Sequence, residues 1–351
     1  MQRLKAVILV GGPGTRLQPL TEATPKSVVP VLNIPFMEHT FAYLRHFGIE
    51  DIVLTLNYLP EVIQGYFGDG SRCGVRLTYC LEEEPLGTAG AVKNAESFLD
   101  GTFFVLNGDI FTDLNLSDML ACHRDSKALA TISLYWVEDP VGLGVVETGS
   151  GLRVKRFIEK PPPGEAPTSW INSGVYILEP EALGQVPADC HYMFERGLFP
   201  RLLDAGDPVY GFQHAGYWMD MGTPEKYFRL NCDLLLSEAG SPLVGDVASD
   251  GIRCGDGIDI HSSAALTAPV IIGNRCRIGR GASVRGPVVI GNDCNLEDDV
   301  SVESAVLWDN INVGSGARLG HCIVSSSVDI EGGQEVVGCV VTPSRTAPLS
   351  R

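Results

Sequence analysis

Residues 6–21 of the chain are AVILVGGPGTRLQPLT, and Pro25 and Lys26 follow shortly after. The apolar residues 6–10 have the pattern of a fully buried strand, and a glycine-rich loop comes directly after them. Glycine lets backbone N–H groups turn inward and lets a ligand approach the main chain closely. Two cations, Arg16 and Lys26, lie just beyond the glycines. The stretch therefore predicts a strand and loop that cradle a polyphosphate.

Two common phosphate-binding motifs do not fit this loop. A Walker A loop needs a lysine directly after its last glycine, and no lysine follows the glycines here. A dinucleotide fingerprint needs a third glycine three residues after Gly14, where the chain has Leu17. A simple glycine turn with two solvated cations is the structural alternative, and the length of the pattern argues against it.

Strands and helices alternate after the loop. Apolar runs predict strands at residues 51–56, 76–80, 103–106 and 128–137. Helical spacing predicts helices at residues 36–47, 59–67, 89–98 and 113–125. This alternation is typical of an α/β fold with a Rossmann-like, mainly parallel sheet. Ligands of such sheets bind beyond the carboxyl ends of the strands, where the glycine-rich loop follows the first strand.

A six-residue repeat marks the C-terminal part. Aliphatic residues recur at every sixth position from Ile260, with two one-residue slips, to Val336. This period predicts a left-handed parallel β-helix over residues 258–345, in which three hexads form one coil. The polar, aperiodic residues 237–257 are predicted to be a linker after a first domain at residues 1–236. A chain of 351 residues is long enough for two domains.

The composition, 44% hydrophobic and 20% charged, is that of a globular protein. With a net charge of −17 the chain has no basic excess, so we expect neither nucleic acid nor a membrane as partner. No apolar run approaches the roughly 20 residues that span a bilayer, and none resembles a signal-peptide core. We therefore expect a cytoplasmic protein whose ten cysteines are reduced and mostly buried.

Residues 11–21 together with Pro25 and Lys26 resemble the signature of the sugar-1-phosphate nucleotidyltransferases. Residues 82–90, EEEPLGTAG, and residues 218–222, WMDMG, are similar to the mannose-1-phosphate guanylyltransferase members of that family. The resemblance implies that residues 1–236 are a nucleotidyltransferase domain that uses GTP and a sugar-1-phosphate. The alternative within the family is a uridylyl-, thymidylyl- or adenylyltransferase that acts on glucose-1-phosphate.

The resemblance also implies which residues bind each substrate. The nucleotide is expected to contact the loop and the strand ends beside it, namely Leu9, Gly11, Gly12, Gly14, Thr15, Glu82, Gly87, Thr88 and Asn107. The sugar phosphate is expected to contact Gly144, Glu159, Lys160 and Asn172. The expected catalytic residues are Arg16, Lys26 and Asp109. The expected cofactor is Mg²⁺, bound by Asp109 and Asp220, since this ion takes few protein oxygens and keeps phosphate and water for the rest.

One chemical argument supports guanine. Guanine presents donors at N1 and N2, and the carboxylate of Glu82 or Glu84 could accept from both. The choice of sugar stays open, because the family usually has tyrosine where this chain has Leu143.

Two other functional classes deserve comparison with the enzyme. A non-catalytic subunit that senses a nucleotide sugar would typically lack the loop cations or the metal carboxylates, and this chain has both. A hexapeptide acyltransferase, suggested by His261 and His321, is less favoured because the first domain is complete. The β-helix is expected to mediate assembly into a homo-oligomer, since its coil surfaces favour association.

Overall fold

The computed structural model describes residues 3–236 and 251–349, and the chain divides into two compact units. The first unit comprises residues 1–12 and 40–218, and the second comprises residues 13–39 and 219–351. These units differ from the domains predicted from the sequence, because the segment after Gly12 groups with the C-terminal part. The glycine-rich loop is thus the point at which the chain leaves the first unit.

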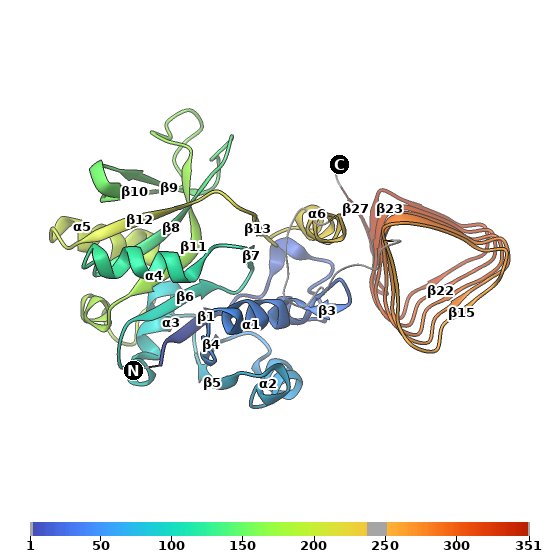
Figure 1. Cartoon of the computed structure of the whole chain (residues 1–351), viewed down its shortest axis with the longest axis horizontal. Coiled ribbons are helices and arrows are strands. Elements are labelled where there is room, and N and C mark those ends of the chain that lie inside the picture. The colour runs from blue at the N-terminus through green and yellow to red at the C-terminus, as the bar shows by residue number, and fades with distance from the viewer. Residues whose placement is uncertain (1–2, 237–250, 350–351) are drawn as a thin grey trace. The chain divides into compact units, whose positions relative to one another are not determined.

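A nine-stranded sheet forms the first unit (Figure 1). Its strands are β1 (Lys5–Leu9), β4 (Asp51–Leu56), β5 (Arg76–Leu81), β6 (Phe103–Asn107), β8 (Ala130–Trp136), β9 (Gly144–Thr148), β10 (Val154–Glu159), β11 (Trp170–Leu178) and β12 (Val209–His214). Strands β5, β4, β1 and β6 are parallel neighbours, whereas β11 runs antiparallel to β6. The prediction of an α/β domain with a mainly parallel sheet is confirmed.

The apolar runs of the sequence form the centre of this sheet. Val7 of β1 and both Phe103 and Val105 of β6 are completely buried, because helices and neighbouring strands cover both faces. Near the C-terminal end of the unit, the rings of Tyr176, Phe194 and Phe199 pack with centroids 5.1 to 5.4 Å apart. This rigid core fixes the strand ends from which the site residues project.

Helices alternate with the strands as expected. They are α1 (Phe36–His46), α2 (Pro60–Phe67), α3 (Gly87–Asn94), α4 (Leu116–Asp125) and α5 (Phe199–Asp204), and the short strand β7 (Ile110–Thr112) follows β6. The prediction that α4 begins at Asp113 is wrong. The side chain of Asn115 caps the helix, accepting hydrogen bonds from the N–H groups of Ser117 and Asp118 at 3.0 and 3.1 Å.

The helices and the cysteines can be compared with the predictions of a membrane-free chain and of mostly buried thiols. Throughout residues 3–236 and 251–349, every helix is too short or too polar to cross a bilayer. Of the ten cysteines, four are buried, five are partly exposed and Cys254 is exposed, so fewer are buried than expected.

The second unit contains segment 13–39, helix α6 (Pro224–Leu235) and the C-terminal repeats. Strand β13 (Trp218–Asp220) leads into α6. The hydroxyl of Thr223 caps α6 by accepting from the N–H of Lys226 at 3.4 Å, as the Thr-Pro sequence predicts.

Segment 13–39 forms the short hairpin of β2 (Pro30–Val31) and β3 (Ile34–Pro35). The buried side chain of Asn231 in α6 accepts from the N–H of Leu32 at 2.9 Å and so fastens the hairpin to the helix.

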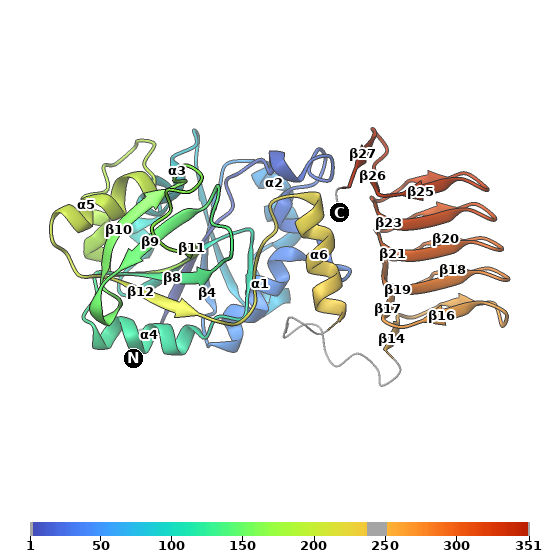
Figure 2. The ribbon, with the colours of Figure 1, turned by 90° about the horizontal axis from the view of Figure 1, so that it is seen from above.

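The C-terminal repeats form a β-helix of stacked parallel strands with a triangular outline (Figure 1), and Figure 2 shows its coils from the side. The strands are β14 (Ile252–Cys254), β15 (Asp259–Ile260), β16 (Ala265–Thr267), β17 (Val270–Ile272), β18 (Arg277–Ile278), β19 (Ser283–Ile290), β20 (Asn295–Leu296), β21 (Ser301–Leu307), β22 (Asn312–Val313), β23 (Arg318–Val324), β24 (Asp329–Ile330) and β25 (Glu335–Val337). The antiparallel pair β26 (Cys339–Val341) and β27 (Thr346–Pro348) ends it.

The β-helix begins earlier than predicted. Residues 237–250 of the predicted linker lie outside the described residues, but Ile252–Cys254 within it pairs with β17 as part of the first coil. The sequence of this strand carries one aliphatic residue and no full hexad, which is why periodicity did not reveal it. The handedness of the coil stays a prediction.

The two slips in the repeat correspond to shorter corners. Arg285 pairs with Glu303, whereas Val288 pairs with Ala305, so the single residue Ser304 stands opposite Gly286 and Pro287. His321 occupies the same corner in the next coil, and both Ser304 and His321 have positive φ, 49° and 44°. Register partners are therefore 18 residues apart in the first coils and 17 in the later ones.

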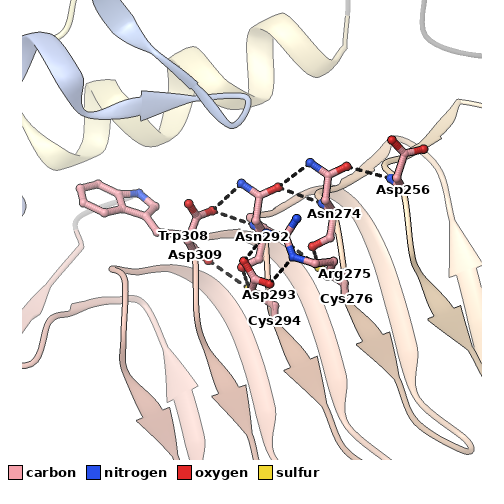
Figure 3. Close-up of polar contacts among 10 residues, drawn as sticks. Asp256, Asn274, Arg275, Cys276, Asn292, Asp293, Cys294, Trp308 and Asp309 are labelled. Atoms are coloured by element: carbon pink, nitrogen blue, oxygen red, sulfur yellow. Dashed lines mark hydrogen bonds and ion pairs between the residues drawn. The ribbon is translucent and has the colours of Figure 1, made fainter. Parts of the chain in front are cut away.

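Side chains of successive coils form a hydrogen-bonded ladder (Figure 3). The Oδ1 atom of Asn292 accepts from the backbone and side-chain N–H groups of Asn274 at 2.9 and 3.0 Å. In the same way Asp309 accepts from Asn292 at 2.7 and 3.2 Å. The thiols of Cys276 and Cys294 point to main-chain carbonyls within this stack, which makes them packing groups of the interior.

Candidate active site

The carboxyl ends of four parallel strands meet at one edge of the first unit. Leu9 of β1 is in register with Thr55 of β4 and with Asn107 of β6, and Leu56 is in register with Leu81. The residues that follow these strands therefore emerge at the same edge, which is where α/β sheets bind ligands. They include four polar or loop residues, Gly11, Asn57, Glu82 and Asp109.

Glu82 lies beside the glycine-rich loop. A Cβ atom built on Gly11 would be 3.4 Å from Oε1 of Glu82 and 3.6 Å from the side chain of Asn57. The other oxygen, Oε2, accepts from the N–H of Leu86 at 2.9 Å, and Asn57 donates to the carbonyl of Glu82 at 2.9 Å. Burial raises the pKa of Glu82 above its ordinary value. The structure thus presents one carboxylate oxygen, Oε1, at the loop, and Glu84 is exposed on the surface.

Space at the start of the loop is open. Among residues 3–236 and 251–349, no atom lies within 4 Å of a Cβ built on Gly12, which leaves room for a ligand to approach the main chain there. At the end of β6 the reverse holds, because a Cβ on Gly108 would be 2.5 Å from the carbonyl oxygen of Leu9. Only glycine permits this approach, and it brings Asp109 next to the end of β1.

Helix α3 uses its first donors within the protein. The N–H groups of Ala89 and Gly90 donate to the carbonyl of Tyr192 at 3.0 and 2.9 Å. The hydroxyl of Thr88 donates to Glu195 at 3.1 Å and accepts from the N–H of Phe194 at 2.9 Å. Two backbone donors of this helix start and the Thr88 hydroxyl are therefore engaged within the protein.

Gly87 is also tied to the same neighbour. It has a φ of 71°, and a Cβ on it would be 2.8 Å from the carbonyl oxygen of Tyr192. Direct contacts of Gly87 and Thr88 with a nucleotide stay a prediction.

Three of the predicted sugar-phosphate residues lie together on β9 and β10. Glu159 is in register with Gly144, and a Cβ on Gly144 would be 2.8 Å from Oε2 of Glu159. The ammonium group of Lys160 lies 3.6 Å from Oε1 of Glu159, and its backbone N–H donates to Leu143 at 3.2 Å. A residue larger than glycine at position 144 would displace the carboxylate.

Asn172 is held by the buried Tyr176. The side chain of Asn172 donates to the Tyr176 hydroxyl at 2.8 Å and accepts from the N–H of Gly174 at 3.1 Å. Asn107 lies beside the same strand, since a Cβ on Gly174 would be 2.7 Å from Nδ2 of Asn107. Tyr176 is therefore a buried support for Asn172, a role that the sequence did not predict.

In the second unit, the later half of the loop is folded against the Lys26 segment. Gly14 has a φ of 64°, and its carbonyl accepts from the hydroxyl of Thr21 at 2.8 Å. A Cβ on Gly14 would lie 3.4 Å from Cβ of Lys26. Thr15 and Arg16 form the first residues of a short 3-10 turn that ends at Leu17.

Arg16 and Asp220 converge on Gly222. A Cβ on Gly222 would be 3.1 Å from Oδ2 of Asp220 and 3.4 Å from Nη1 of Arg16. The ammonium of Lys226 in the first turn of α6 donates to Oδ1 of the buried Asp220. Lys226 thus pairs with this carboxylate, and Arg16 approaches the same glycine.

Two residues of these clusters were missed in the sequence. Asn57 follows β4 directly, and the rule that selected Asn107 and Asp109 after β6 would also have found it. Lys226 carried no local signal, because its partner Asp220 lies across the start of a helix.

The chemistry of the two predicted metal ligands suits Mg²⁺. This ion is commonly held by one or two carboxylates, with phosphate oxygens and water completing the shell. Asp109 belongs to the first unit and Asp220 to the second, so each unit supplies one of the two predicted ligands. Within residues 3–236 and 251–349, no three side chains of His, Cys, Asp or Glu gather in a way that could hold a metal. The pairing of Asp109 with Asp220 stays a prediction.

Known protein families match both the N-terminal and the C-terminal parts of the chain. The nucleotidyl transferase family matches residues 5–237, and the GlmU-like C-terminal hexapeptide family matches residues 259–340. The mannose-1-phosphate guanylyltransferase of Mycobacterium tuberculosis is 38% identical over 80% of this chain and 77% of its own length. The UTP–glucose-1-phosphate uridylyltransferase of Synechocystis is 32% identical over 99% of this chain and 95% of its own length.

The chain is also similar to a solved structure. The crystal structure of HddC from Yersinia pseudotuberculosis complexed with GMP-PN has a TM-score of 0.57 and 30% identity, and covers 65% of this chain and 98% of its own. The family match spans the sheet, the glycine-rich loop and the strand ends described above. The chain therefore belongs to the nucleotidyl transferase family and is a nucleotidyltransferase.

Proposed function

We propose that the protein transfers a guanylyl group from GTP to mannose-1-phosphate and releases pyrophosphate. The observation that carries the choice of base is Oε1 of Glu82, which lies beside Gly11 while Oε2 accepts from Leu86, since guanine offers the row of N–H donors that a carboxylate accepts. The 38% identity to the Mycobacterium tuberculosis guanylyltransferase supports both substrates. The likeness to HddC, solved with GMP-PN, supports the guanine nucleotide.

The reaction needs no protein nucleophile. A phosphate oxygen of the sugar-1-phosphate forms a bond to the α-phosphorus of the triphosphate. The bond from that phosphorus to the bridging oxygen breaks, and its electron pair leaves with pyrophosphate. Catalysis then consists of positioning and charge neutralisation.

Residues of the chain supply these two effects. Arg16 and the glycine-rich loop hold the β- and γ-phosphates that leave. Lys26 neutralises the α-phosphate and the incoming phosphate, and Lys160 with Glu159 anchors the sugar phosphate. Asp109 and Asp220 would hold Mg²⁺, which when bound would neutralise charge on the phosphates. Lys226 donates to Oδ1 of Asp220 and so orients that carboxylate.

A second candidate is uridylyl transfer to glucose-1-phosphate. It is favoured by the Synechocystis relative, which aligns over 99% of this chain. Leu143, in place of the tyrosine usual in the family, leaves the sugar less determined than the base.

A matrix of four nucleoside triphosphates against several sugar-1-phosphates, with pyrophosphate release as the measurement, decides between these candidates. We expect the highest kcat/KM with GTP and mannose-1-phosphate. Preference for UTP would reject the guanine assignment. No release with any pair would reject catalysis and leave a nucleotide-sugar sensor as the function.

The β-helix is proposed to bring chains together as a homo-oligomer. Val337 on β25, near the end of the β-helix, is 61% exposed, an apolar residue on a surface that association would cover. Light scattering at several concentrations measures the mass, and a monomer at all of them would contradict the proposal. The cytoplasmic location stays a prediction.

A further inference from the structure

Segment 13–39 carries Gly14, Arg16 and Lys26, and it shares one compact unit with the β-helix. Polar contacts join the two at separate places. One group of contacts lies at the β2–β3 hairpin, and the other lies at Glu22, between the glycine-rich loop and Lys26.

The first attachment runs through helix α6. The indole N–H of Trp308 donates to the Tyr227 hydroxyl at 2.8 Å, which donates to the carbonyl of Pro30 at 2.5 Å. Asn33 at the tip of the hairpin donates directly to the carbonyl of Ile290 at 2.6 Å. Trp308 directly precedes Asp309, the last acceptor of the ladder in Figure 3, so the stack of coils extends to this contact.

The second attachment comes from the end of the β-helix. Ser344 and Arg345 lie in the turn between β26 and β27, which is closed by a hydrogen bond from the N–H of Thr342 to the carbonyl of Arg345 at 2.9 Å. The Ser344 hydroxyl donates to Oε2 of Glu22 at 2.7 Å, and the Arg345 guanidinium lies 2.6 Å from Oε1. Both oxygens of the Glu22 carboxylate are therefore engaged by this turn.

Glu22 is well placed to fix the phosphate-binding residues. It follows Thr21, whose hydroxyl holds the carbonyl of Gly14 at 2.8 Å, and it precedes Lys26 by four residues. Lys26 thus lies between two points, Glu22 and Pro30, at which the segment is attached to the rest of the unit. Movement of Glu22 would be transmitted to Gly14 on one side and to Lys26 on the other.

We propose that Arg345 and Ser344 are positioning residues that act through Glu22 to hold the Gly14–Lys26 stretch in the conformation that receives the triphosphate. The kinetic part of this inference rests on the proposed function. It gives the end of the β-helix a role in the affinity for NTP.

The chain offers a matched control. Arg275 resembles Arg345 in exposure, 64% against 50%, and pairs with Asp293 at 2.6 Å, but its partner lies within the β-helix. Pairs this exposed contribute little to stability, so Arg345→Ala and Arg275→Ala are both expected to fold. Equal melting temperatures check that expectation.

We expect Arg345→Ala to raise KM for GTP roughly two- to fivefold, the range that loss of a partly exposed ion pair allows, with kcat changed less. Arg275→Ala should leave KM unchanged. The exchanged pair Glu22→Arg with Arg345→Glu should recover part of the loss. Equal KM values for Arg345→Ala and the wild type, or equal increases in both alanine variants, would overturn the proposal.

Hydrogen exchange tests the same inference without activity. The N–H groups of Leu17, Val28 and Val29 donate to carbonyls within the segment, so their exchange rates report its order. Arg345→Ala should speed exchange there, and Arg275→Ala should not. If the wild-type enzyme released no pyrophosphate, the proposed function would fail while this result still decided the attachment. Unchanged exchange in Arg345→Ala would reject the attachment itself.

Discussion

Replacement of Glu82 by glutamine tests the base assignment most directly. Oε2 is committed to the N–H of Leu86 at 2.9 Å, and glutamine can keep that bond only with its carbonyl oxygen. The NH₂ group must then take the position of Oε1, 3.4 Å from the Cβ position of Gly11. A site that accepted donors becomes a site that presents them.

The expected loss follows from the bond that disappears. Hydrogen bonds to a charged group contribute about 1.5–3 kcal/mol, so kcat/KM with GTP should fall roughly 10- to 150-fold. Uracil presents carbonyl acceptors to such a group, so kcat/KM with UTP should fall much less. The fold should persist, because a neutral side chain replaces a carboxylate whose pKa is raised by burial.

Pyrophosphate release with both nucleotides measures this change. Glu84→Gln is the matched control, since Glu84 is exposed two residues away, and it should behave as wild type. An unchanged ratio of kcat/KM for GTP and UTP in Glu82→Gln would refute the reasoning. A loss of the same size in Glu84→Gln would move the base contact to that residue.

Three further predictions follow from other contacts. Burial raises the pKa of Glu82 above the ordinary value for glutamate, about 4.3. Protonation removes the acceptor for guanine, so KM for GTP should rise as the pH falls, and this rise should begin at a higher pH than for an ordinary glutamate. Glu82→Gln should abolish this dependence in a pH profile. Gly222→Ala places a Cβ 3.1 Å from Oδ2 of Asp220 and should displace that carboxylate slightly. We expect kcat to fall roughly tenfold, since a displacement of about 1 Å in an active site lowers the rate about 100-fold. Gly184→Ala is the control, because no described atom lies within 4 Å of a Cβ at that position. Asn292→Ala removes the acceptor for two N–H groups of Asn274 and should cost about 1–3 kcal/mol in urea unfolding, against about 0.5 kcal/mol or less for the exposed Asn312→Ala.

Local patterns of the sequence were sufficient for the sheet and the coil. The buried strands at Val7 and Phe103 are apolar on both faces because helices cover the parallel strands. Such strands therefore appear in the sequence as continuous apolar runs. The hexads are equally local, since each inward position of a coil repeats the same packing. Contacts between distant residues are different. Asp113, predicted to begin α4, instead lies before the helix and accepts from the N–H of Tyr217, 104 residues away.

The same limit applies to the site. The strand-end rule pointed to Asp109, because a parallel sheet brings its carboxyl ends to one edge, whereas Glu82 came from the family resemblance. The engagement of Thr88 by Glu195 joins residues 107 positions apart, and no local pattern contains it. A helix start that looks free in the sequence can therefore be capped by another part of the fold.

The irregularities of the repeat have a structural purpose of their own. A perfect 18-residue coil would place two residues at the corner where Ser304 and His321 stand alone. Helix α6 packs against β19 and β21 at this side, and the ring of Phe228 lies 4.7 Å from that of His321. Trp308, just after β21, reaches Tyr227 of the same helix. The shortened corners thus fall in the coils that contact α6.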